Sequence, residues 1–187
     1  MNTTESRRKR QLSLAEYYRL PDPDERLSIV RGMVAREPTA AYSHAALHTA
    51  IARRIAEHAE AGGLGTVLTE GGFLLREDPP TVLGPDIAFV TRDRVPADPR
   101  SVVHPRFAPD LVIEIISTNE RAARLHERLL EFLDAGTRLV WLVYPNTRSV
   151  MAFDADARVR LLREQDGLDG GDVLPGFRIT VAQLLEM

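Results

Sequence analysis

Two acidic residues lie at the start of, or inside, segments that the sequence predicts to be buried β-strands. Asp86 precedes the apolar run 87–90, and Glu114 lies within the apolar run 111–116. An ionised carboxylate in such a strand is costly, so Glu114 must be neutralised by an arginine, by protonation or by a metal ion. Two carboxylates from neighbouring strands can bind Mg²⁺, which takes few protein oxygens and completes its shell with water and a substrate phosphate. The sequence therefore predicts a divalent-cation site at Asp86 and Glu114.

A third acid, Asp110, precedes the same apolar run and shares one face of the predicted strand with Glu114. At ~3.3 Å per residue the two carboxylates are about 13 Å apart along the strand, so one ion cannot bridge them. We interpret Asp110 as a strand-start residue that hydrogen-bonds to nearby backbone.

Arginine supplies almost all of the positive charge. The chain has 24 Lys and Arg residues, and Lys9 is its only lysine. Arg121, Arg124 and Arg128 follow one another at spacings of three and four, which places them on one face of a helix. They are candidates for contacts with phosphate. The alternative is a solvated stripe that pairs with the neighbouring acids Glu120, Glu127 and Glu131.

His44 lies at the start of a predicted helix. If it faces Glu114, it can orient a water molecule or a carboxylate. The alternative is a histidine that bonds to backbone near the helix start. Both interpretations remain open from the sequence.

The elements that must position these residues follow from hydrophobic periodicity and from glycine and proline signals. The predicted helices cover a short turn after Ser13, residues 39–60, residues 120–135 with Leu125, Leu129, Leu130, Phe132 and Leu133 inward, and a last turn at 184–185. The predicted strands are 27–30, 33–35, 65–68, 72–75, 86–90, 111–116, 139–143, 150–153 and 159–162. Trp141 and Phe132 are expected in the core.

Composition indicates one α/β domain. The chain has 187 residues, 44% hydrophobic and 27% charged, with no cysteine and a net charge of -3. Disulfides and thiolate zinc sites are excluded, and any contact with nucleic acid must be local. Because no apolar run suggests a membrane span or a signal peptide, we expect a cytoplasmic protein with no membrane partner. We expect a disordered basic tail over residues 1–12 and a single domain over residues 13–187.

An ordered series of segments carries a family resemblance. The segments are 26–32, the helix that His44 opens, 69–75, 84–90, 108–117, 132–136 with 140–143, and 171–177. No single segment is specific. In this order, over most of the chain, they resemble the Uma-type family of restriction endonucleases, a branch of the PD-(D/E)XK nuclease superfamily.

The resemblance implies an α/β (α+β) fold of the restriction-endonuclease type, with a mixed central sheet flanked by helices and β additions at both ends. It also implies hydrolysis of a DNA phosphodiester by a water molecule that Mg²⁺ or Mn²⁺ activates, with Asp86 and Glu114 as ligands, and a homodimer. The family's catalytic lysine matches Arg128 here, and a further acid of the family matches Ser28.

Both departures affect the site. Arg128 keeps the positive charge, but a guanidinium does not give up its proton and so cannot act as a base, and Ser28 lowers the negative charge that attracts an ion. We therefore expect an impaired endonuclease with Asp86, Glu114 and Arg128 as catalytic residues and with Ser28 and His44 lining the pocket. One alternative is a nuclease fold that binds nucleic acid or protein without cutting. Another is a structural domain whose acids pair with arginine, which an ion pair between Arg128 and Glu114 would favour.

Overall fold

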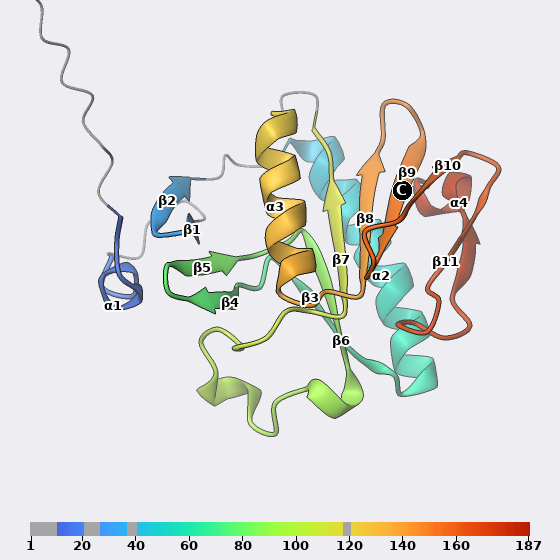
Figure 1. Ribbon diagram of the computed structural model, residues 1–187. Helices are drawn as coiled ribbons and strands as arrows, with labels where there is room; N and C mark the ends of the chain where they lie inside the picture. Colours follow the sequence, from blue (N-terminus) through green and yellow to red (C-terminus); the bar gives the residue numbers. More distant parts are fainter. Residues whose placement is uncertain (1–10, 21–26, 37–40, 118–120) are drawn as a thin grey trace, which may run out of the picture.

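A six-stranded mixed sheet forms the centre of the molecule (Figure 1). The computed structural model describes residues 11–20, 27–36, 41–117 and 121–187. The strand order is β10-β9-β8-β7-β6-β3, in which β7 and β8 are parallel and the other pairs are antiparallel. The strands are β3 (Gly65–Thr69), β6 (Ile87–Thr91), β7 (Leu111–Ile115), β8 (Leu139–Tyr144), β9 (Ser149–Asp154) and β10 (Val159–Arg163).

Two long helices cover opposite faces of this sheet (Figure 1): α2 (Tyr42–Gly62) and α3 (Ala122–Asp134). β7 is buried on both faces because its alternate side chains pack in two different clusters. Ile113 packs in the cluster that contains Ile51 of α2, whereas Val112 packs in the cluster that contains Leu129 of α3. The apolar run around Glu114 is thus explained by two-sided burial.

The smaller sheet has the order β2-β1-β5-β4 and lies beside α3 (Figure 1). Its strands are β1 (Leu27–Val30), β2 (Met33–Arg36), β4 (Phe73–Glu77) and β5 (Pro80–Leu83). β5 was not among the predicted strands, because two consecutive prolines, Pro79 and Pro80, stand at its start. Pro80 is the first residue of the strand, where proline is tolerated.

The remaining elements are short. They are α1 (Leu14–Tyr17), η1 (Arg92–Arg94), η2 (Pro99–Ser101), β11 (Gly167–Asp169), β12 (Arg178–Thr180) and α4 (Val181–Leu184). The short helical turn predicted after Ser13 is present as α1 and begins with a capping box, since the side chains of Ser13 and Glu16 each accept a backbone N–H from the other residue. The β11–β12 pair was not among the predicted strands.

The limits of the long helices follow the sequence signals. α2 ends at Gly62, close to the predicted end at residue 60, and its C-cap residue Gly63 adopts the left-handed conformation with φ 59°, which glycine tolerates. Phe132 and Trp141 are fully buried, as expected. The prediction that Leu130 points inward is wrong, because it is 40% exposed. It lies about 100° around the helix from buried Leu129.

The predicted tail falls mainly on residues 1–10, which are outside the described residues, as are 118–120 at the predicted start of α3. Leu12, within the predicted tail, donates its backbone N–H to the carbonyl oxygen of Gly32 at 2.8 Å. None of the described helices is long and apolar enough to span a bilayer.

Candidate active site

The pairing of β6 with β7 brings Asp86 and Glu114 together. The register runs through Phe89 opposite Leu111, Ala88 opposite Val112 and Ile87 opposite Ile113. Continued by one residue, it places Asp86 opposite Glu114. Directly opposed residues of an antiparallel pair lie on the same face, with Cβ atoms about 4.5–5.5 Å apart. Oδ2 of Asp86 also accepts the N–H of Ile115, the residue after Glu114, at 2.7 Å.

Asp86 is held at this position from two elements. Its carbonyl oxygen lies 2.6 Å from Nε2 of His48 on α2 and accepts the N–H of Glu70 at 3.1 Å. Its carboxylate Oδ2 lies 3.7 Å from Nε2 of His44, near the start of the same helix. Since its side chain is only 15% exposed, Asp86 has a restricted orientation.

The acidic residues of the candidate site affect the pKa of His44. The interaction with the nearby Asp86 carboxylate raises the pKa of His44; partial burial opposes this rise, and the charges of Glu114 and Glu70 reinforce it. His44 also borders a cavity of about 350 Å³ at the ends of β7 and β8. The cavity is lined by Ala41, Ser43, Leu47, residues 115–117, Pro145, Asn146, Arg148, Leu185 and Met187.

Arg128 neutralises Glu114. Its Nη2 donates to Oε1 of Glu114 at 2.7 Å and to the carbonyl oxygen of Gly84 at 3.1 Å. The two side chains are only 9% and 11% exposed. The sequence left open whether an arginine, protonation or a metal ion compensates the charge of Glu114. The structure contains an arginine partner, which α3 supplies across the face of β7.

The arginine stripe of α3 is divided between two environments. Arg121 is exposed at the N-cap, Arg124 is half-buried, and Arg128 is buried against Glu114. Only the first two have side chains that remain accessible at the start of the helix. The geometry brings Arg128, but not the whole stripe, into the candidate site.

Ser28 lies on β1 in the smaller sheet and is buried. Its hydroxyl group makes no hydrogen bond to any of the described residues, and it is not among the residues that line the cavity beside His44. The expectation that Ser28 and His44 line one pocket stays a prediction, since Asp86 and Glu114 do not line this cavity either.

Asp110 lies at the opposite end of β7 and has structural partners. Its Oδ2 accepts the backbone N–H and the hydroxyl of Thr91 at 2.9 and 3.1 Å, and its Oδ1 accepts from Arg94 at 2.7 Å. These bonds agree with the interpretation of Asp110 as a residue that fixes the start of a strand.

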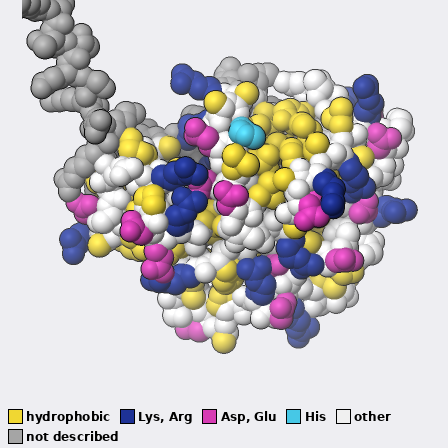
Figure 2. Space-filling model, viewed as in Figure 1, with side chains coloured by type: hydrophobic (Ala, Val, Ile, Leu, Met, Phe, Trp, Pro, Cys, Tyr) yellow, Lys and Arg dark blue, Asp and Glu magenta, His cyan; other side chains and the backbone are white. Residues whose placement is uncertain are grey.

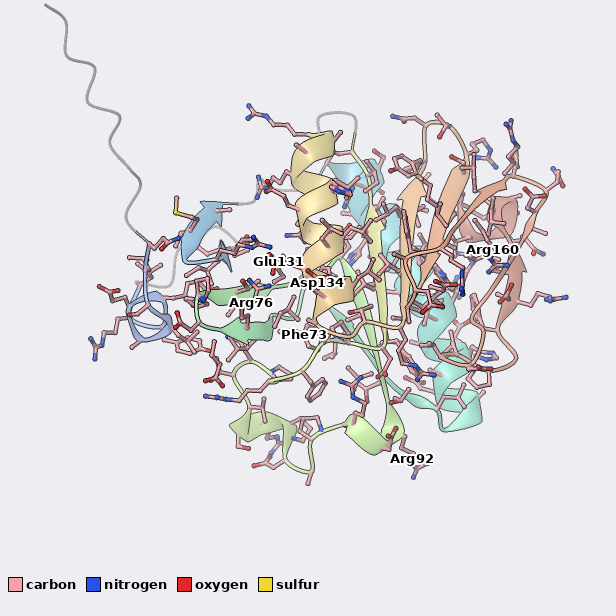
Figure 3. The ribbon with its side chains drawn as sticks, in the orientation of Figure 1. Phe73, Arg76, Arg92, Glu131, Asp134 and Arg160 are labelled. Carbon is pink, nitrogen blue, oxygen red and sulfur yellow. The ribbon has the colours of Figure 1, made fainter. Side chains whose placement is uncertain are left out.

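The sequence analysis missed the burial of Glu131, which it treated as one possible solvated partner of the arginine stripe. Glu131 is 2% exposed. It accepts from Nε of Arg31 at 2.6 Å and from Nη2 of Arg76 at 2.9 Å. Figure 3 shows Arg76 and Glu131 between α3 and the smaller sheet. No local signal marks this contact, because the partners are 100 and 55 residues away.

The candidate donor set for a cation is therefore a pair of carboxylates. Among the described residues, no group of three or more His, Asp or Glu side chains is arranged to hold a metal ion. Two carboxylate groups fit a hard cation such as Mg²⁺ or Mn²⁺, which keeps several water ligands.

The comparisons with known proteins define the fold as nuclease-like. The structure matches a crystal structure from Anabaena variabilis ATCC 29413, described as "a putative nuclease belonging to DUF820", with a TM-score of 0.84 and 18% sequence identity. The match covers 93% of this chain and 97% of that chain.

The chain belongs to the Uma2 family, described as "Putative restriction endonuclease", whose model matches residues 14–182. No curated protein sequence matches this chain. The family and the α+β fold inferred from the sequence are confirmed.

Proposed function

We propose that this protein is a metal-dependent endonuclease that hydrolyses DNA phosphodiesters, with Asp86 and Glu114 as the ion ligands. The observation that carries the proposal is the hydrogen bond from the N–H of Ile115, the residue after Glu114, to the Asp86 carboxylate, on adjacent segments of the sheet and beside the buried cation of Arg128. The nuclease descriptions of the family and of the similar structure support the same reaction class.

The carboxylates would hold Mg²⁺ or Mn²⁺ together with water and a phosphate oxygen of the substrate. When bound, such an ion lowers the pKa of its water and offsets the charge that develops on the phosphate. The backbone N–H of Ile115 orients the Asp86 carboxylate, and His44 positions it from the cavity side.

Arg128 has one favourable and two unfavourable effects on the proposed reaction. Its guanidinium provides positive charge for the scissile phosphate. However, it cannot accept the proton of the attacking water. It also compensates Glu114 within the protein, which weakens the attraction between that carboxylate and an ion. We therefore propose an impaired rather than a fast enzyme.

On the substrate side, Arg121 and Arg124 at the start of α3 are the proposed phosphate contacts.

We further propose that residues 13–187 act as one domain in a cytoplasmic homodimer, in which two sites related by a two-fold axis meet the two DNA strands. An apolar surface supports association. Figure 2 shows hydrophobic side chains gathered beside α3 over β8 and β9. Leu130, Val159 and Leu161 are 40%, 48% and 58% exposed.

The test is nicking of supercoiled plasmid with Mg²⁺ or Mn²⁺ by the parent, Asp86→Ala and Arg128→Lys proteins. We expect weak metal-dependent nicking by the parent, none by Asp86→Ala and more by Arg128→Lys. The matched control is Asp93→Ala, which removes an exposed acid of η1. No cleavage by any of the proteins, each shown to be folded, would count against the proposal.

The ion pair between Arg128 and Glu114 favours a second candidate function. A nuclease fold whose acids are neutralised internally can bind nucleic acid or protein without cutting. Metal-dependent cleavage separates the two candidates, because the second function predicts none in either the parent or the Arg128→Lys protein. Fluorescence anisotropy with labelled duplex DNA then shows whether the uncleaving protein binds DNA.

A further inference from the structure

A second hollow lies between α2 and the C-terminal segment. Its volume is about 430 Å³. One wall comes from α2, through Arg54, Glu57 and His58, and the other from residues 176–179 with Gln183 and Glu186. None of the residues assigned above to the candidate active site lines it.

Arg54 lines this hollow and has one side-chain donor without an acceptor among the described residues. Its Nη1 atom is buried and has no hydrogen-bond partner among the described residues. A buried N–H group without an acceptor costs free energy, and the cost is larger when the group is charged. An acceptor atom that enters the hollow beside Arg54 would remove this cost.

The opposite wall offers further donors. Arg178, on β12, is exposed and forms no side-chain hydrogen bond or ion pair within the described part of the chain. The Oε1 atom of Gln183 accepts the backbone N–H and the hydroxyl of Thr180 at 2.9 and 3.1 Å. The group that Gln183 can offer to a ligand is therefore its amide nitrogen, which is a donor.

The acids at the rim interact with cations that do not line the hollow. Glu57 accepts from Arg53 at 2.9 Å, and the charge of Glu186 contributes to the raised pKa of Arg148. His58 lies 2.8 Å, through Nε2, from the carbonyl oxygen of Pro175 and packs edge-on against Phe177 at 5.4 Å between ring centroids. The histidine ring is thereby fixed. Within the described part of the chain, neither Arg54 nor Arg178 forms a side-chain ion pair, and Glu57 is paired with Arg53.

We propose that this hollow binds a phosphate group, held by Arg54 and Arg178 with the amide of Gln183. Guanidinium groups match the geometry of phosphate oxygens and form charge-assisted hydrogen bonds with them. The phosphate can come from free phosphate or from the DNA backbone. Leu185 and Met187, in the same C-terminal segment, line the cavity beside His44, so this segment contributes to the walls of both hollows. The proposal that the phosphate comes from DNA rests on the proposed function. The proposal that the hollow binds a phosphate group does not depend on it.

The first arm of the test measures thermal unfolding in inorganic phosphate and in chloride at equal ionic strength. The proteins are the parent, Arg54→Gln, Arg178→Gln and the control Arg100→Gln, which removes an exposed arginine of η2 and changes the net charge equally. We expect phosphate to raise the midpoint of the parent and the control, and this rise to be largely lost in the other two. No rise in the parent, or equal rises in all four, would overturn the proposal. The unfolding curve in chloride shows whether each variant is folded. If Arg54→Gln does not fold, Arg178→Gln still decides the test, because Arg178 is exposed and its replacement leaves the core intact.

The second arm identifies the source by measuring the salt dependence of duplex DNA binding. If the phosphate belongs to DNA, Arg54→Gln and Arg178→Gln each reduce the slope of log K against log salt by about 1, and Arg100→Gln leaves it unchanged. Unchanged slopes together with a lost phosphate effect in the first arm assign the site to free phosphate. If the parent binds no DNA, the proposed function is contradicted, but the phosphate site is still decided by the first arm.

Discussion

Arg128 and Glu114 form a buried ion pair at 2.7 Å between α3 and the central strand β7. The pair places a cation directly on one of the two carboxylates that the fold brings together. It therefore couples the stability of the helix–sheet packing to the charge of the candidate metal site. Removal of either partner should change both.

The first prediction concerns stability. Arg128→Ala leaves Glu114 buried without this partner, so the free energy of unfolding should fall by about 3–5 kcal/mol. Chemical denaturation with urea measures this change. The double variant Arg128→Met with Glu114→Leu should recover most of the loss, because no buried charge remains unpaired. Equal losses in the single and double variants would show that packing, and not charge, dominates.

The second prediction concerns ion affinity and is independent of cleavage. Arg128→Gln removes the cation that competes for Glu114, so Mn²⁺ should bind more tightly than to the parent. Asp86→Asn should bind Mn²⁺ more weakly. Isothermal titration calorimetry measures both affinities, with Arg124→Gln as the control for loss of one positive charge on the same helix. If Arg128→Gln weakened binding, the idea of competition at Glu114 would be wrong.

The third prediction concerns pH and His104. Burial lowers the pKa of His104 below its ordinary value of 6.5, so the unfolded chain binds a proton more readily than the folded protein. The neutral form of buried His104 therefore contributes to the free energy of unfolding. This contribution is fully present above pH 6.5 and is lost as the pH falls from 6.5 through the pKa of His104 in the folded protein. Its ring stacks on Tyr18 at 5.5 Å and its Nδ1 lies 3.2 Å from the Tyr18 hydroxyl, which links α1 to the 102–110 segment.

The check on His104 is the melting temperature of the parent and His104→Asn proteins as a function of pH. Below pH 6.5 the parent should lose stability more steeply than the variant. His126→Asn, at an exposed position of α3, should follow the parent curve. Parallel curves for the parent and His104→Asn would remove His104 as the cause.

The fourth prediction concerns the cluster formed by Glu131, Arg31 and Arg76. Arg76→Ala should lower the free energy of unfolding more than Arg31→Ala, because the Arg76 side chain is 33% exposed whereas that of Arg31 is 59% exposed. The better-buried cation is less screened by solvent. Urea denaturation ranks the two.

The control for this ranking is Arg53→Ala, which breaks an exposed i,i+4 pair with Glu57 and should cost less than about 0.5 kcal/mol. A larger loss for Arg31→Ala than for Arg76→Ala would show that exposure does not govern the strength of these pairs.

The sequence by itself determined the elements whose signals are local. The three- and four-residue periodicity defined α2 and α3, the glycine pair ended α2, and the apolar run of β7 indicated a strand buried on both faces. The order of the family segments also gave the fold and the family. These predictions succeeded because each depends on residues that are close together in the chain or on their order along it.

Only the tertiary structure decided which charges meet. The sequence left three partners open for Glu114, and the packing of α3 on β7 supplied Arg128 from 14 residues away. It also buried Glu131, which accepts hydrogen bonds from Arg31 and Arg76. These outcomes depend on how the helices and sheets pack against one another. Side chains distant in sequence become neighbours only after that packing is complete, so local patterns cannot specify them.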